Sequence, residues 1–220
     1  MFIVTNRRVH ETKTDLEAFG REPSDKGPNE LRMAEAKRVA GKWKVKVFPN
    51  VINAADAATA GLKPRTDDSG SPVPYYASQL VARGLIDRLE KLDRNLVLFV
   101  HGYNNDLKAV LDRAQAFEDT YDVEVLVFTW PANGGGAAGT LSYKSDKRDA
   151  IASIGGLSRV FIKLAEYLEE FNHERIAKIE VEATRRFPDD DEKWNKFYAS
   201  AAERGCPFTV NLVLHSMGNY

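Results

Sequence analysis

Near the end of the chain, a serine directly follows an apolar run. Phe208–Leu214 is rich in strand-forming residues and leads through one histidine into Ser216-Met217-Gly218. A sharp turn from a strand into a helix projects a serine hydroxyl above the sheet and aims the next N–H, here that of Met217, at a developing oxyanion. Gly218 keeps such a turn free of backbone clashes. The spacing predicts a catalytic nucleophile, although Leu214 stands where the G-x-S-x-G pattern has a small residue. A serine that only caps a helix is the alternative.

A second group of residues with chemical potential follows an earlier apolar run. His101-Gly102-Tyr103 comes directly after Leu96–Val100. A second oxyanion donor in this kind of site comes from the loop after a neighbouring strand, and the N–H of Tyr103 is the candidate. Gly102 lets the backbone approach a substrate closely. We expect His101 to orient this loop by hydrogen bonding and not to act as the base.

The elements that must position these residues alternate between short apolar runs and helical periods, which predicts an α/β fold with a mostly parallel sheet. The predicted strands are Phe2–Thr5, Trp43–Val47, Leu96–Val100, Val123–Trp130 and Phe208–Leu214. Strict alternation makes the second of these a half-exposed edge strand, whereas the third and fourth are apolar on both faces.

Three helices are predicted between these strands. The first carries an apolar stripe of Val81, Leu85, Leu89 and Leu92, the second begins near residue 107, and the third runs from about Asp149 to Phe171. Either Asn104 or Asn105 is expected to cap the second helix. By contrast, Leu16–Glu35 is polar and contains glycines and prolines, which predicts a loop.

Three short motifs together are more specific than any one of them. They are His101-Gly102-Tyr103-Asn104-Asn105, Phe128-Thr129-Trp130-Pro131 and Leu214-His215-Ser216-Met217-Gly218-Asn219. In this combination the chain resembles a bacterial family of α/β-hydrolases of uncharacterised function, which are esterase- or lipase-like. The N-terminal region, with Phe19-Gly20 and Gly27-Pro28-Asn29-Glu30-Leu31-Arg32, is also similar to that family. The resemblance spans the chain apart from Arg175–Arg204.

The resemblance implies the doubly wound α/β-hydrolase fold and a serine-type hydrolase. It maps Ser216 to the nucleophile and Tyr103 and Met217 to the oxyanion hole, with His101, Gly102 and Gly218 in support. The implied reaction is hydrolysis of a small-molecule, ester-like acyl substrate through an acyl-enzyme.

The other members of a catalytic triad do not follow the serine. In α/β-hydrolases the acid and the histidine come after the nucleophile in chain order. Only four residues follow Ser216, and all four histidines precede it: His10, His101, His173 and His215. Because neighbouring side chains at an elbow point apart, His215 is a poor base. We therefore expect a single hydrolase domain over residues 1–220 that is incomplete at its C-terminus and comprises strands one to five.

Two alternatives to a complete enzyme stay open. The chain could be a catalytically inactive, truncated or binding module, or it could be one half of a split hydrolase that a second chain completes. In either case Phe208–Leu214 is expected to present an open sheet edge, which favours self-association or pairing with a completing chain. The charged segment Arg175–Arg204 is expected to form a helical insertion away from Ser216.

Other local patterns carry weaker signals for cofactors or metals. Gly134, Gly136 and Gly139 match a dinucleotide fingerprint, but no acidic residue ends another strand at the distance such a site needs. A loop over the active site is the preferred interpretation. His101 and His215 lack a third metal ligand. The acidic run 189–192 lacks the spacing of a calcium loop. No cofactor and no metal is expected.

The composition narrows the functional class. With 31 basic and 32 acidic residues the formal net charge is −1, and no basic block supports nucleic-acid binding. No apolar run approaches the length of a membrane span. The single cysteine, Cys206, excludes an intrachain disulfide and fits a reducing compartment. The expectation is a cytoplasmic protein without a membrane span.

Overall fold

A mixed, mostly parallel six-stranded sheet forms the centre of the protein in a computed structural model that describes residues 1–103, 105–132 and 143–219. In spatial order its strands are β12 (Val210–Leu214), β10 (Leu96–Val100), β11 (Glu124–Thr129), β1 (Phe2–Thr5), β4 (Arg32–Val39) and β5 (Lys42–Val47). The first four are parallel to one another, and β4 and β5 are antiparallel to their neighbours. β12, the strand before Ser216, pairs in parallel with β10, the strand before His101.

The register brings the carboxyl ends of three parallel strands together. Val100 of β10 lies opposite Phe128 of β11 on one side and Leu214 of β12 on the other. The segments that follow these residues therefore emerge at the same edge of the sheet. This edge carries all three sequence motifs.

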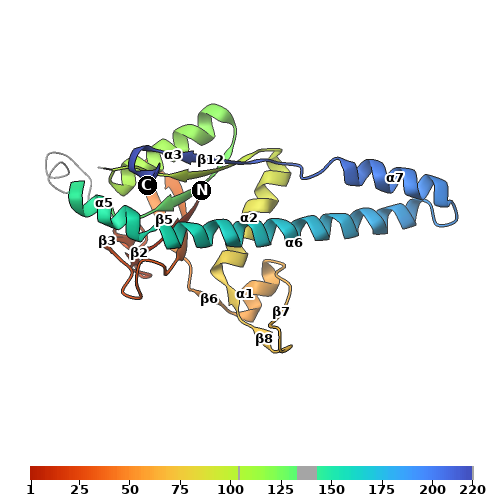
Figure 1. The fold of residues 1–220 in the computed structure, drawn as a ribbon, viewed down its shortest axis with the longest axis horizontal. Helices are drawn as coiled ribbons and strands as arrows, with labels where there is room; N and C mark the ends of the chain where they lie inside the picture. Colours follow the sequence, from red (N-terminus) through yellow and green to blue (C-terminus); the bar gives the residue numbers. More distant parts are fainter. Residues whose placement is uncertain (104, 133–142, 220) are drawn as a thin grey trace.

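Helices cover both faces of the sheet (Figure 1). One face packs against α2 (Ala77–Leu92) and α6 (Ile154–Arg186), and the other packs against α3 (Leu107–Tyr121). The side chains of the strands alternate accordingly: Leu98 and Leu126 lie in the α2–α6 core, whereas Phe99 lies in the α3 core. The predicted stripe of α2 is buried except for Leu92, which ends the helix and is 46% exposed.

The remaining elements are short. They are β2 (Arg7–Val9), η1 (Leu16–Ala18), β3 (Phe19–Pro23), β6 (Val51–Ile52), α1 (Ala54–Thr59), β7 (Arg65–Thr66), β8 (Pro72–Val73), β9 (Tyr75–Tyr76), α5 (Tyr143–Ala152), α7 (Asp191–Glu203) and η2 (Ser216–Asn219). Three two-stranded sheets pair β2 with β3, β6 with β9 and β7 with β8.

The prediction of a loop over Leu16–Glu35 was wrong. This segment contains η1, β3 and the first half of β4, and β4 pairs with β1 in the central sheet. The buried positions of β4 are Ala34 and Ala36, which alternate with charged residues. Alanine is only weakly hydrophobic, so the alternation of buried and exposed residues in β4 is hard to recognise in the sequence, and the segment looks polar throughout. The sheet consequently has one strand more than predicted, while β5 occupies the predicted edge position.

The helix predicted to end near Phe171 is longer in the structure. After a short break at Ser153, α6 continues through the charged segment to Arg186, and α7 folds back beside its distal half. Figure 1 shows this hairpin extending from the body, at the end of the molecule away from the C-terminus. Within the described residues, no helix combines the length and apolarity needed to cross a membrane.

Candidate functional site

Ser216 sits at a sharp turn between β12 and the short helix η2. Its backbone is left-handed, with φ +54°, which is an uncommon and strained conformation for a side chain other than glycine. The turn is closed by a hydrogen bond from Gly218 N–H to the carbonyl of His215 at 2.9 Å. A serine that caps a helix normally has an extended backbone, so this geometry favours an elbow over a simple cap.

Two glycines allow the turn and the loop after β10 to touch. A Cβ atom on Gly102 would lie 2.5 Å from the carbonyl oxygen of His215 and 2.6 Å from Cβ of Ser216. A Cβ atom on Gly218 would lie 2.9 Å from the carbonyl oxygen of Val100. Both contacts are closer than real Cβ atoms make. The structure therefore brings Gly102 and Ser216 together and leaves no room for a side chain at either glycine.

His101 is fully buried beneath this contact. Trp130 N–H donates to its Nε2 at 3.2 Å, so Nε2 is the acceptor and Nδ1 carries the proton. Nδ1 then donates to the carbonyl of Gly102 at 3.0 Å, and the Thr129 hydroxyl donates to Nε2 at 3.0 Å. Burial, followed by the positive charge of Arg7, lowers the pKa of His101 to about 3. His101 is therefore a neutral anchor with both nitrogens engaged.

Trp130 locks the same histidine from a second direction. Its ring stacks on the imidazole with 5.0 Å between centroids and 7° between planes. Its indole N–H also donates to the carbonyl of His101 at 2.9 Å. The tryptophan after β11 and the histidine after β10 thus form one buried unit.

The buried network continues to a residue that sequence reasoning missed. Arg7 donates through Nε to the Thr129 hydroxyl at 3.1 Å and through Nη1 to the carbonyl of Gly20 at 3.2 Å. Burial lowers the pKa of Arg7 to about 10, a shift that the carboxylate of Asp146 opposes. The available signal was an arginine two residues after the predicted strand Phe2–Thr5, but its role depends on β1 lying beside β11, which local sequence does not specify.

Hydrogen bonds also fix the loop that carries Tyr103. The Gly102 carbonyl accepts from His101 Nδ1 and from Asn105 Nδ2, the latter at 3.2 Å, and Asn105 Nδ2 also donates to the Tyr103 carbonyl at 2.9 Å. Asn105 was predicted as one of two possible helix caps. Instead Asp106 caps α3, accepting from Ala109 N–H at 2.7 Å, and Asn105 braces the loop. The other candidate, Asn104, lies outside the described residues.

Met217 anchors the other side of the turn. Its side chain is 3% exposed and packs in the core between the sheet and the helices α2 and α6. Because the side chain is fixed in this way, the backbone of the residue after Ser216 is held in place. Tyr103 is half-buried and packs against the same core.

His215 lies on the surface beside α3. Arg113 Nη1 is 3.4 Å from its Nε2 and 3.5 Å from its Nδ1. Partial burial and then the charge of Arg113 lower the pKa of His215. In the described part of the chain, the Ser216 hydroxyl forms no hydrogen bond with an imidazole or a carboxylate. The structure thus places neither His101 nor His215 as a base for Ser216.

Residues 79–182 match a family described as "Alpha/beta hydrolase of unknown function (DUF900)". This match spans the segment from α2 to α6, including His101 and Trp130. It supports an α/β-hydrolase-like fold of uncharacterised function for this chain. No curated protein and no solved structure matches the chain.

Other predicted features have less to do with the site. The glycine loop with Gly134, Gly136 and Gly139 lies outside the described residues. Across residues 1–103, 105–132 and 143–219, no three side chains of His, Cys, Asp or Glu gather as metal ligands. In the acidic run, Asp190 caps α7 by accepting from Lys193 N–H at 3.0 Å.

Proposed function

We propose that this chain supplies the nucleophile and the oxyanion hole of a serine hydrolase that acts on small ester-like acyl substrates. Ser216 Oγ attacks the acyl carbonyl, the carbonyl π electrons move to oxygen, and the tetrahedral intermediate expels the alcohol to leave an acyl-enzyme. Water then hydrolyses this ester and restores Ser216. The observation that carries the proposal is the left-handed turn at Ser216, pressed against Gly102 at the carboxyl edge of the sheet.

The orientation of one peptide unit supports the proposed oxyanion hole. The Gly102 carbonyl points to His101 and Asn105, which both donate to it. In a planar trans peptide the N–H points opposite to the C=O, so the N–H of Tyr103 faces away from these donors. The buried network thus fixes the direction of this donor before substrate binds. Preorganised donors of this kind contribute most to stabilising a tetrahedral intermediate.

The reaction also requires a general base that accepts the Ser216 proton. His101 already uses both ring nitrogens, and His215 lies against the guanidinium of Arg113. We therefore propose that the general base and its acid partner are supplied from outside the described residues, as in a split hydrolase that a second chain completes. The same observation favours a second candidate function, a module that binds acyl ligands at this site without turning them over.

A fluorophosphonate probe tests the proposal. We expect it to label Ser216 in the form of the protein that contains the triad acid and histidine, and Ser216→Ala to abolish labelling. Hydrolysis of a p-nitrophenyl ester should fall by on the order of 10⁴- to 10⁶-fold in this variant. Ser200→Ala, in the exposed part of α7, is the matched control and should behave as the parent. Equal hydrolysis by the Ser216→Ala variant would refute the assignment.

The compartment is part of the same proposal. The single cysteine, Cys206, is exposed and unpaired, which is compatible with a reducing compartment such as the cytoplasm. The proposed chemistry uses no cofactor, because nucleophile, donors and base are all protein groups.

A further inference from the structure

A two-part cleft opens between α2, α6 and the segment that leads from β4 to α2. Its outer chamber has a volume of about 560 Å³ and its inner chamber about 60 Å³. Both are bordered by Met33, Ser78, Arg159, Lys163 and Tyr167, so the small chamber lies directly beneath the large one. The outer volume falls in the range of small-molecule sites.

The inner chamber is apolar. Its floor consists of Val4 and Leu126 from the sheet, Leu85 from α2, and Val160 and Leu164 from α6. An apolar group placed there leaves water and gains contacts with the surrounding side chains, which is favourable in proportion to the buried area. The inner chamber is large enough for a short stretch of hydrocarbon and too apolar for a charge.

Three cationic side chains line the outer chamber, and two of them are paired with carboxylates. Arg65, Arg159 and Lys163 line it, against one acidic residue, Glu30, whose carboxylate accepts from Asn50. Arg159 makes no ion pair with a described residue, since its hydrogen-bond partner is the neutral carbonyl of Asn29. Among the described residues, Lys163 forms an ion pair with the exposed Glu166, a surface pair of small energy. Arg65 is neutralised by Glu170 at 2.7 Å, so Arg159 is the lining cation that has no ion-pair partner among the described residues and can attract an anion.

A pair of hydroxyl groups marks the boundary between the chambers. Ser78 Oγ and Tyr167 Oη lie 2.7 Å apart, so one of their two hydrogens is shared between them. The second hydrogen stays available to donate to a ligand oxygen. Burial raises the pKa of Tyr167, which keeps this hydroxyl protonated.

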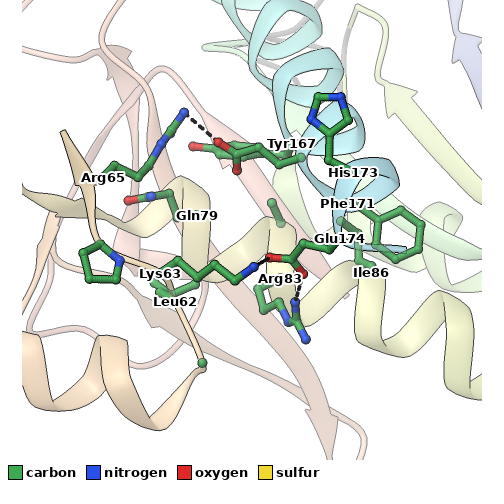
Figure 2. A pocket seen from close by; sticks show the side chains of 14 residues that line it. Leu62, Lys63, Arg65, Gln79, Arg83, Ile86, Tyr167, Phe171, His173 and Glu174 are labelled. Carbon is green, nitrogen blue, oxygen red and sulfur yellow. Dashed lines mark hydrogen bonds and ion pairs between the residues drawn. The ribbon is translucent and has the colours of Figure 1, made fainter. Parts of the chain in front are cut away.

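Ion pairs hold the outer wall in place, as the neighbouring pocket in Figure 2 shows. Lys63 lies 2.8 Å from Glu174, which also pairs with Arg83 of α2 at 3.1 Å, and Arg65 lies 2.7 Å from Glu170. These contacts tie residues 63–65 to α6. In the pocket of Figure 2 the cations are thus neutralised by α6 carboxylates, whereas Arg159 in the outer chamber is not.

We propose that this cleft binds a short-chain monocarboxylate, with its short hydrocarbon tail in the inner chamber and its carboxylate at Arg159 and the Ser78–Tyr167 hydroxyl pair. The lining residues include none from the loop after β10 or from η2, so this site is separate from Ser216. The inference does not depend on the proposed hydrolase activity.

Isothermal titration calorimetry with butyrate, whose three-carbon tail matches the size of the inner chamber, tests the proposal. We expect one molecule of butyrate to bind per chain. Butan-1-ol has the tail without the charge, and acetate has the charge with a single methyl group, so each should bind at least about tenfold more weakly. Arg159→Gln should raise the Kd for butyrate about tenfold, since it removes a charged hydrogen bond. Leu164→Phe, which fills the inner chamber, should weaken binding independently of charge.

Two control variants distinguish binding in this cleft from binding elsewhere on the protein. Arg186→Gln lies at the distal end of α6 and should leave the Kd unchanged, as should Ser216→Ala. The proposal is overturned if butyrate does not bind, or if Arg159→Gln binds it as tightly as the parent. Equal weakening by Arg186→Gln would mean unspecific charge attraction, and loss of binding in Ser216→Ala would place butyrate in the nucleophile site. Either result would also overturn the proposal.

Discussion

The rim around Ser216 and the α6–α7 hairpin satisfy their polar groups in opposite ways. At the rim, His101, Thr129 and Trp130 are at most 1% exposed and are joined by direct hydrogen bonds. In the hairpin, α7 contains no buried residue, and the polar contacts are mostly exposed ion pairs, such as that of Arg185 with Glu182 at 2.7 Å. Buried hydrogen bonds are costly to break, whereas water readily replaces exposed ones. Single-atom changes should therefore matter at the rim and have little effect in the hairpin.

The largest expected effect comes from adding one methyl group at the rim. Gly102→Ala would place Cβ 2.5 Å from the His215 carbonyl oxygen, and neither backbone segment can move without disturbing the sheet ends. We expect a loss of stability of about 1–3 kcal/mol or more, together with loss of fluorophosphonate labelling at Ser216. Chemical denaturation and probe labelling measure the two effects. Gly41→Ala, in an open turn with φ +75°, is the control and should lose only about 1 kcal/mol and keep labelling.

The buried histidine makes the rim sensitive to acid. Because the pKa of His101 is about 3 in the folded protein and 6.5 in its ordinary state, the unfolded chain binds a proton that the folded chain excludes. The contribution of His101 is therefore fully present above pH 6.5 and is lost progressively between pH 6.5 and about 3. Urea denaturation across this range should show stability rising with pH, with a shallower slope in His101→Gln. An NMR titration in which the His101 imidazole of the folded protein takes up its proton near pH 6.5 would contradict this.

The Thr129 hydroxyl links Arg7 to His101, so a substitution at Thr129 tests whether this buried link stabilises the loop that carries Tyr103. Thr129→Val keeps the shape but removes the hydroxyl that links Arg7 to His101, so a buried donor and a buried acceptor each lose a partner. We expect a destabilisation of about 1–3 kcal/mol and a slower rate of labelling at Ser216. Thr209→Val removes an exposed hydroxyl bond to Asn95 and should stay within about 0.5 kcal/mol of the parent. If Thr129→Val and Thr209→Val lowered the free energy of unfolding equally, burial of the hydroxyl would not explain the importance of Thr129.

The same comparison explains what sequence could predict. The strands β10 and β11 are apolar at nearly every position, so their ends, and with them His101 and Trp130, are predicted from sequence alone. The long-range contacts are not. Arg7 meets Thr129 only because β1 lies beside β11, although 122 residues separate them. Likewise, β4 escaped prediction because its buried residues are small.

The effect of a substitution at the outer edge of β12 is expected to lie between those at the rim and those in the hairpin. β12 ends the sheet, and it pairs with β10 on one side but with no other strand of the described structure. Val210 is 40% and Leu212 46% exposed on it. We propose that this edge mediates self-association or receives a completing chain, because exposed apolar edge strands template pairing. Leu212→Lys should shift the protein toward the monomer in size-exclusion chromatography coupled to light scattering. Val181→Lys replaces an exposed apolar residue on α6 in the same way and should leave the association state unchanged.

The smallest effect is expected in the hairpin itself. Glu182 pairs with both Arg185 and Arg186, and these two contacts lower the pKa of Glu182 to about 2. All three groups are nevertheless accessible to water, which solvates each charge when the pair is broken. Glu182→Gln should therefore leave the Tm of the protein unchanged within error at moderate salt, despite the large pKa shift. The matched change at a buried carboxylate is Glu124→Gln, which removes the charge that faces Arg94 and Arg88 and should lower the Tm measurably. If the two variants melt alike, burial does not set the energetic weight of a carboxylate in this protein, and the reason given for the contrast between rim and hairpin fails.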